Sequence, residues 1–71
     1  MQIDQDYIIE AINHEIEDRE AAHYDTSNEV DELLLLRGMI ETRATMNYKT
    51  YEWVAYIVSA YREQELRVEL E

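Results

Sequence analysis

Residues 8–36 read IIEAINHEIEDREAAHYDTSNEVDELLLL and hold two helical patterns separated by one turn signal. Isoleucines recur at helical spacing in the first pattern and form an apolar stripe roughly 100° wide: they are Ile8, Ile9, Ile12 and Ile16. The turn signal is Asp-Thr-Ser-Asn at 25–28, side chains that favour turns and caps over helix interiors. This stretch predicts a helical hairpin, with one helix at about 4–24 and the next at about 28–46.

Candidate caps place the starts of these two helices. Asp4 or Asp6 suits the first N-terminus, as a cap or as a charge that complements the helix dipole. Thr26, with Glu29 three residues later, fits a capping box at the start of the second helix. Gly38 lies inside the second pattern, where glycine costs about 1 kcal/mol relative to alanine. Because the apolar pattern runs through it, we expect the helix to continue.

A third helical pattern covers about residues 50–65. Its candidate cap is Asn47 or Thr50. A stripe typical of a packed core follows at i, i+4 and i+8: it is Trp53, Ile57 and Tyr61. Residues 65–71, ELRVELE, alternate apolar and charged side chains, which fits either a helix end or a short strand.

The composition favours an all-α fold in a single domain, residues 1–71. The chain has no proline, one glycine and 46% hydrophobic residues, whereas small strand-rich folds need turn residues every few positions. It has no cysteine, which excludes disulfides and thiolate metal sites. We expect a small three-helix bundle, or a helical hairpin plus a C-terminal helix, with a dimer through the second and third helices left open.

The negative charge is concentrated in the first half of the chain. Residues 1–32 carry eleven acids and one base, a net charge of −10, whereas residues 33–71 carry six acids and five bases, a net charge of −1. Direct binding to nucleic acid or to an anionic membrane needs cationic patches. The charge distribution therefore favours a protein partner with a basic surface.

Acids of the first two helices form the candidate partner-binding surface. Ordinary surfaces mix both signs of charge, but Glu15–Arg19 is the one oppositely charged pair four residues apart in the first helix. Each single carboxylate fits a solvated face that keeps a small protein soluble. Like charges at such spacing repel by about 0.2–0.5 kcal/mol per pair, so the acids taken as a set favour the alternative, a face kept for a partner. Arg19 falls near the centre of the apolar stripe, where its stem should follow the core edge. The candidate residues are Asp6, Glu10, Glu17, Asp18, Glu20, Glu29, Asp31 and Glu32.

The second helix has more apolar surface than a one-sided helix needs. Either it lies at the centre of the bundle between its two neighbours, or another subunit covers it. The third helix adds four tyrosines and a tryptophan between residues 48 and 61, side chains that are enriched at interfaces because they bury area and keep a polar end. Candidate residues for contact with a partner or a second copy are Leu35, Met39, Met46 and Tyr56.

The sequence predicts no catalytic, metal or cofactor site. Glu10, His14 and Asp18 lie four apart on one face, and Glu20 with His23 has the Glu-x-x-His spacing of helical di-metal sites. Such a site needs a second copy of that motif, which the chain does not contain. There is no cysteine nucleophile, Gly-rich phosphate loop or recognisable Ser-His-Asp set. We expect a non-enzyme, with metal binding through the two histidines as a remote alternative.

Size, acidity and helicity resemble those of small acidic inhibitors, often phage-encoded, that mimic nucleic acid, although no family motif is present. A row of carboxylates along a helix attracts a basic groove and can block it. The leading hypothesis is a viral DNA-mimic inhibitor that occludes the basic nucleic-acid-binding surface of a host nuclease, polymerase or defence complex. The alternative is a homo-oligomeric structural or adaptor protein that uses the apolar face of the second helix.

No membrane or secretion signal is visible in the sequence. The longest apolar run is the four leucines at 33–36, far short of the about 20 residues that a membrane span needs. The opening MQIDQDY has no basic segment followed by an apolar one. We expect a cytoplasmic protein, in the host cytoplasm if the protein is viral.

Overall fold

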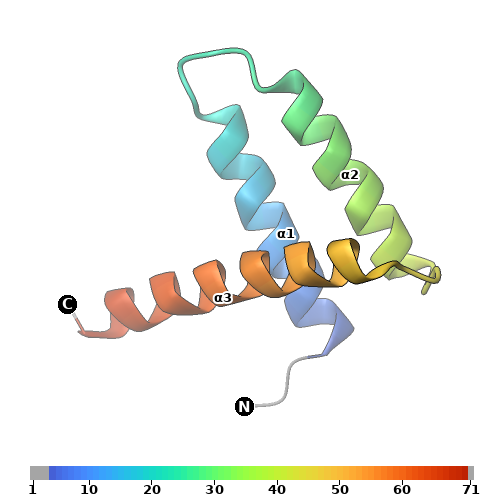
Figure 1. Ribbon diagram of the computed structural model, residues 1–71. Helices are drawn as coiled ribbons and strands as arrows, with labels where there is room; N and C mark the ends of the chain where they lie inside the picture. The colour runs from blue at the N-terminus through green and yellow to red at the C-terminus, as the bar shows by residue number, and fades with distance from the viewer. Residues whose placement is uncertain (1–3, 71) are drawn as a thin grey trace.

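The computed structural model describes the backbone of residues 4–70 and the side chains of residues 4–67. In this part of the chain there are three helices and no strand (Figure 1): they are α1 (Gln5–Glu20), α2 (Ser27–Glu41) and α3 (Tyr48–Leu70). The predicted all-α, three-helix class is confirmed. α2 runs through Gly38 without a break, and α3 continues to Leu70, so ELRVELE is helical as far as it is described. Its last residue, Glu71, lies outside the described residues.

α1 ends earlier than the sequence pattern predicts. It stops at Glu20 rather than near Tyr24, and the backbone N–H of Ala22 donates to the carbonyl of Arg19 at 3.2 Å. The hydroxyl of Thr26 donates to the same carbonyl at 2.7 Å. The connection is therefore tied back onto the end of α1, and this contact leaves no room for a further helical turn.

The capping box predicted for the start of α2 is wrong. Thr26 occupies the N-cap position, but its side chain is buried and makes no cap hydrogen bond, because its hydroxyl is used on α1. Asp25 supplies the contact instead: its Oδ1 accepts from the backbone N–H of Ser27 at 3.0 Å and from the Ser27 hydroxyl at 2.7 Å. These hydrogen bonds favour the charged carboxylate and lower the pKa of Asp25.

The other two N-termini are capped by residues that the sequence predicts. Oδ1 of Asp4 accepts from the backbone N–H of Tyr7 at 2.9 Å, so Asp4 rather than Asp6 caps α1. Oδ1 of Asn47 accepts from the backbone N–H and from the hydroxyl of Thr50, both at 2.9 Å. Each cap satisfies a backbone donor that would otherwise lack a partner in the first turn.

α2 stops at Glu41 rather than near residue 46, because the chain turns at Arg43 with a positive φ of 56°. The backbone N–H of Ala44 donates to the carbonyl of Met39 at 2.9 Å, and that of Arg43 to the carbonyl of Ile40 at 3.2 Å. This pair of hydrogen bonds is a Schellman motif, in which glycine is the usual residue at the left-handed position. A residue with a Cβ pays about 1–2 kcal/mol there.

α1 is the central helix of the molecule. α1 and α2 form an antiparallel hairpin, and α3 crosses α1 at a steep angle (Figure 1). Cα atoms of α1 approach both other helices within 8 Å, whereas those of α2 and α3 do not approach each other so closely. A central position for α2, the first explanation of its apolar surplus, is therefore wrong. The apolar arc of α1 is broad enough to accept two neighbours, because Ile8 and Ile9 extend the arc around the buried Ile12.

One hydrophobic core joins the three helices, and each contributes three buried members: they are Ala11, Ile12, Ile16, Leu33, Leu36, Ile40, Val54, Ile57 and Val58. Polar contacts fix α2 against α1. Nε2 of Gln5 donates to the carbonyl of Ile40 at 3.1 Å, and Nη1 of Arg37 donates to Oδ1 of Asn13 at 2.7 Å. The hairpin is thus held by apolar burial along its length and by hydrogen bonds at two points.

Replacing Arg43 by glycine is expected to stabilise the protein by about 1 kcal/mol, because glycine adopts a positive φ without the Cβ penalty. The thermal midpoint should rise by about 4–8 °C for a domain of this size, as measured by circular dichroism. Arg43→Ala is the control, since it removes the charge but keeps the Cβ. Equal increases in both variants would assign the effect to charge rather than to backbone conformation.

Candidate partner-binding surface

All eight acidic residues predicted to contact a partner have exposed side chains. In the part of the chain whose side chains are described, the ion pairs are Glu15–Arg19 at 2.9 Å, Arg37–Glu41 at 3.5 Å and His14–Asp18 at 3.7 Å. Asp18 is therefore the one member of the predicted set with a basic neighbour there, and that histidine carries charge only when protonated. The other seven carboxylates have no basic partner among the described side chains.

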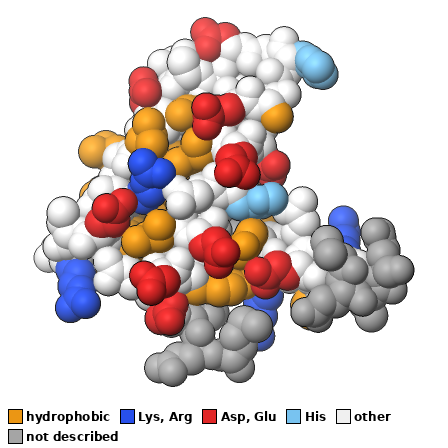
Figure 2. Space-filling model, turned by 180° about the vertical axis from the view of Figure 1, so that it is seen from behind, with side chains coloured by type: hydrophobic (Ala, Val, Ile, Leu, Met, Phe, Trp, Pro, Cys, Tyr) orange, Lys and Arg blue, Asp and Glu red, His pale blue; other side chains and the backbone are white. Residues whose placement is uncertain are grey.

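Three of these acids, Asp6, Glu10 and Glu17, form what we call the α1 stripe. At the helical rotation per residue, they lie within about 40° of one another, on the side of α1 turned away from Ile12. Their Cα atoms are spaced by about 6 and 10 Å along the helix axis. Asp6 and Glu10 also line a shallow depression with Asn13. Figure 2 shows carboxylates spread over much of one face of the molecule, with few Lys or Arg side chains between them.

The remaining acids do not extend this stripe, so the predicted set is not one continuous face. Glu20 and Asp31 line a shallow depression at the α1–α2 connection. Glu29 and Glu32 line a different pocket, which is bounded by all three helices. The structure therefore divides the predicted acids into separate groups with different neighbours.

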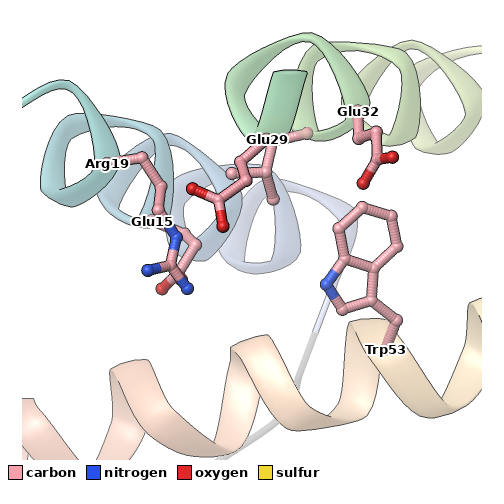
Figure 3. Close-up of a pocket in the computed structure, with 6 residues that line it drawn as sticks. Glu15, Arg19, Glu29, Glu32 and Trp53 are labelled. Carbon is pink, nitrogen blue, oxygen red and sulfur yellow. The ribbon is translucent and has the colours of Figure 1, made fainter. Parts of the chain in front are cut away.

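The pocket bounded by the three helices has a volume of about 210 Å³ (Figure 3). Its lining residues are Glu15, Arg19, Glu29, Glu32, Leu33 and Trp53. Nη2 of Arg19 lies 2.9 Å from Oε1 of Glu15. The carboxylate of Glu29 points toward this pair, and that of Glu32 points toward the ring of Trp53 (Figure 3). We call this the three-helix pocket.

The sequence pattern does not predict the three-helix pocket. It assigns Trp53 to the core stripe of the third helix, but the structure leaves this side chain partly exposed at the edge of the core. It places the stem of Arg19 along the core edge, which agrees with a half-exposed side chain. No local signal joins these two residues to Glu29, because they meet only through the packing of three helices.

The two histidines lie in different surroundings. Nε2 of His14 is 2.6 Å from Oε1 of Gln64 in α3, and its ring centroid is 5.2 Å from that of Tyr61. His23 is exposed in the α1–α2 connection. Among the described residues, no three His, Cys, Asp or Glu side chains come together in a group that could hold a metal ion. The structure therefore places His14 in the contact between α1 and α3.

Two tyrosines complete that contact. The rings of Tyr7 and Tyr61 meet edge to face at 5.7 Å, and the Tyr7 hydroxyl donates to Oε2 of Glu65 at 3.2 Å. Partial burial raises the pKa of Tyr7, and the hydrogen bond and charge of Glu65 raise it further. Partial burial also raises the pKa of Tyr61, with the charge of Glu10 as the next cause. Both surroundings favour the neutral phenol over the phenolate.

The predicted apolar contacts differ in exposure. The side chains of Leu35 and Tyr56 are 69% and 70% exposed. Met39 is half-buried, and Met46 packs against the core. Leu34, which the sequence does not single out, is 40% exposed next to Leu35. The apolar surface available on α2 is therefore centred on the two leucines.

In comparisons with protein-family models, with curated proteins and with solved structures, no match to the chain was found. Among the described residues, no helix combines the length and the apolar character that crossing a membrane requires. The function is therefore inferred from the charges, pockets and exposed side chains of the chain itself.

Stability is expected to fall at alkaline pH, and Tyr7→Phe should reduce that loss. A phenol with a raised pKa contributes stability that is present below about pH 10, its value in the unfolded chain, and that is lost as pH rises through the raised pKa. The measurement is the urea midpoint between pH 8 and 11. Tyr56→Phe, which removes a phenol hydroxyl at an exposed position of α3, is the matched control. Parallel slopes for wild type and Tyr7→Phe would contradict the assignment.

Proposed function

We propose that this protein is a small acidic inhibitor that binds a protein partner and occludes its basic, nucleic-acid-binding surface. The observation that supports the proposal is the set of seven exposed carboxylates without a basic partner among the described side chains. The target class is a host nuclease, polymerase or defence complex. In this proposal the protein is encoded by a phage and acts in the host cytoplasm.

The α1 stripe supplies charge in a fixed geometry. Phosphates of one DNA strand follow one another at 3.4 Å along the duplex axis. The Cα atoms of the stripe, spaced by about 6 and 10 Å along the helix axis, therefore approximate the spacing of every second and every third phosphate. A rigid helix holds the backbone at this spacing, so binding has to order only the acidic side chains. Such a surface attracts a basic groove and competes with nucleic acid for it.

Charge alone steers association but contributes less to affinity than buried contacts do. Exposed apolar and aromatic side chains are therefore the expected anchors in the complex. Leu35 and Tyr56 are the most exposed of those that the sequence predicts. In this proposal the carboxylates orient the partner during association, and the apolar anchors slow its dissociation.

The test compares two triple variants that remove the same number of charges. Asp6→Asn/Glu10→Gln/Glu17→Gln neutralises the α1 stripe, and Glu41→Gln/Glu52→Gln/Glu63→Gln neutralises three exposed acids elsewhere. The immobilised wild-type protein should retain a basic nucleic-acid-binding protein from host lysate and release it as salt increases, because salt screens exposed charges. The purified target should lose DNA binding when the inhibitor is added.

The stripe variant should fail to retain that target, whereas the matched control should retain it. Circular dichroism is the check that both variants are folded. Equal retention by the two variants would contradict a role for the stripe. A target that still binds DNA in the presence of saturating inhibitor would contradict occlusion.

A second candidate function, self-association through α2, is favoured by the surroundings of Gly38. A Cβ added to Gly38 would meet nothing within 4 Å, so packing within the chain does not require glycine there. Leu34 and Leu35, one helical turn before it, are exposed. A glycine beside exposed leucines lets a second helix approach closely. A homo-oligomeric adaptor would use this face.

Leu35→Glu should then convert a dimer into a monomer, as measured by light scattering after size exclusion. Leu66→Glu is the matched control, because Leu66 is exposed on α3. Gly38→Ala should raise the stability of the monomer by about 1 kcal/mol through helix propensity and weaken the dimer. A wild-type protein that is monomeric at all concentrations would exclude this candidate.

A further inference from the structure

The three-helix pocket combines an aromatic wall with an excess of negative charge. Three of its lining residues are glutamates and one is an arginine, which gives a formal net charge of −2. We infer that this pocket binds a cationic side chain of a protein partner, and that an arginine fits it best. The inference rests on the proposed function in one respect, since it names the chemical group of the partner that the acidic protein would hold.

Only one of the three glutamates in the pocket forms an ion pair with a basic side chain among the described residues. Arg19 is already paired with Glu15 at 2.9 Å, on the same helix. Glu29 and Glu32 come from α2 and have no basic partner among the described side chains. They are three residues apart, hence neighbours on the helix surface that repel each other. A cation that enters the pocket relieves this repulsion, whereas an anion increases it.

Trp53 gives the pocket a second feature that selects for cations. A positive group placed over an indole ring is attracted by the electrons of the ring face, and tryptophan is the strongest aromatic partner for this interaction. Trp53 is partly exposed, while the neighbouring Val54, Ile57 and Val58 are buried and attach α3 to the core. Part of the indole is therefore accessible to a ligand, and the rest packs against the core.

The shape and the chemistry of the pocket favour arginine over lysine. The cavity has a volume of about 210 Å³, and its wall of glutamates and Trp53 lies over the buried side chain of Leu33. A guanidinium group is planar, so it can stack on the indole and donate to a carboxylate from its edge. Glu32, which points toward the ring of Trp53 (Figure 3), is placed to accept that hydrogen bond.

The pocket and the α1 stripe involve different sides of the central helix. Glu15 and Arg19 lie on the half of α1 that faces the other two helices, and the stripe lies on the opposite half. Charges can therefore be removed from one site while the other stays intact. This separation makes the inference testable independently of the proposed function.

Trp53 is the one tryptophan of the chain, so its fluorescence and its indole N–H resonance report on the pocket directly. The probe is N-acetyl-arginine amide, titrated into the full chain at fixed ionic strength. Saturable changes in both signals are expected. N-acetyl-citrulline amide has nearly the same shape without the charge and should give no saturable change. Equal responses to the two probes would overturn the inference.

Matched double variants then test which acids are responsible. Glu29→Gln/Glu32→Gln should weaken binding of the arginine probe by about tenfold, the scale of one lost charged contact. Asp6→Asn/Glu10→Gln removes the same charge from the α1 stripe and should leave the affinity within a factor of about two. All four substituted side chains are exposed, and circular dichroism is the check that both variants keep the fold. Equal weakening by both variants would reduce the effect to net charge and overturn the assignment.

The outcomes separate the pocket from the proposed function. If the arginine probe binds but the target still binds DNA at saturating inhibitor, the occlusion proposal fails and the pocket assignment stands. If the target loses DNA binding but the probe does not bind at Trp53, the pocket assignment fails and occlusion stands. A lysine probe that binds more tightly than the arginine probe would contradict the preference for guanidinium.

Discussion

Burial of the apolar arc of α1 is the interaction on which the rest of the structure depends. Ile12 is fully buried and Ala11 and Ile16 are nearly so, and this one helix contacts both of its neighbours. Full burial of one such side chain contributes about 1.5–3 kcal/mol, in a domain whose net stability is expected to be about 3–5 kcal/mol. Since α2 and α3 do not approach each other closely, neither would remain in place without α1.

The same packing determines where charge can lie. Two sides of α1 are occupied by other helices, and the three carboxylates of the α1 stripe share the side that remains, where they repel one another and attract basic groups. α3 crosses α1 steeply while α2 runs alongside it (Figure 1). The three-helix pocket lies where these helices diverge, and glutamates of α2 and Trp53 of α3 line it together.

The proposed function would use two kinds of contact with a basic partner, on different sides of the molecule. The stripe offers regularly spaced charge at the surface, which favours rapid association and depends strongly on salt. The pocket offers a partly enclosed site, where charge and an aromatic ring act on a single cationic side chain. The exposed leucines of α2 would provide a third, apolar contact, either with a second copy of the chain or with the apolar part of a partner.

Local features of the sequence were sufficient to predict the three helices, the caps at Asp4 and Asn47 and the exposure of the acids. Periodicity and capping depend on residues only a few positions apart. These local features were insufficient to predict where α2 ends, because Arg43 adopts a left-handed conformation that normally favours glycine. The central position of α1, the separation of the acids into groups and the three-helix pocket were decided by tertiary structure alone. These features depend on the order and angle in which helices pack, and side chains far apart in the sequence determine that packing.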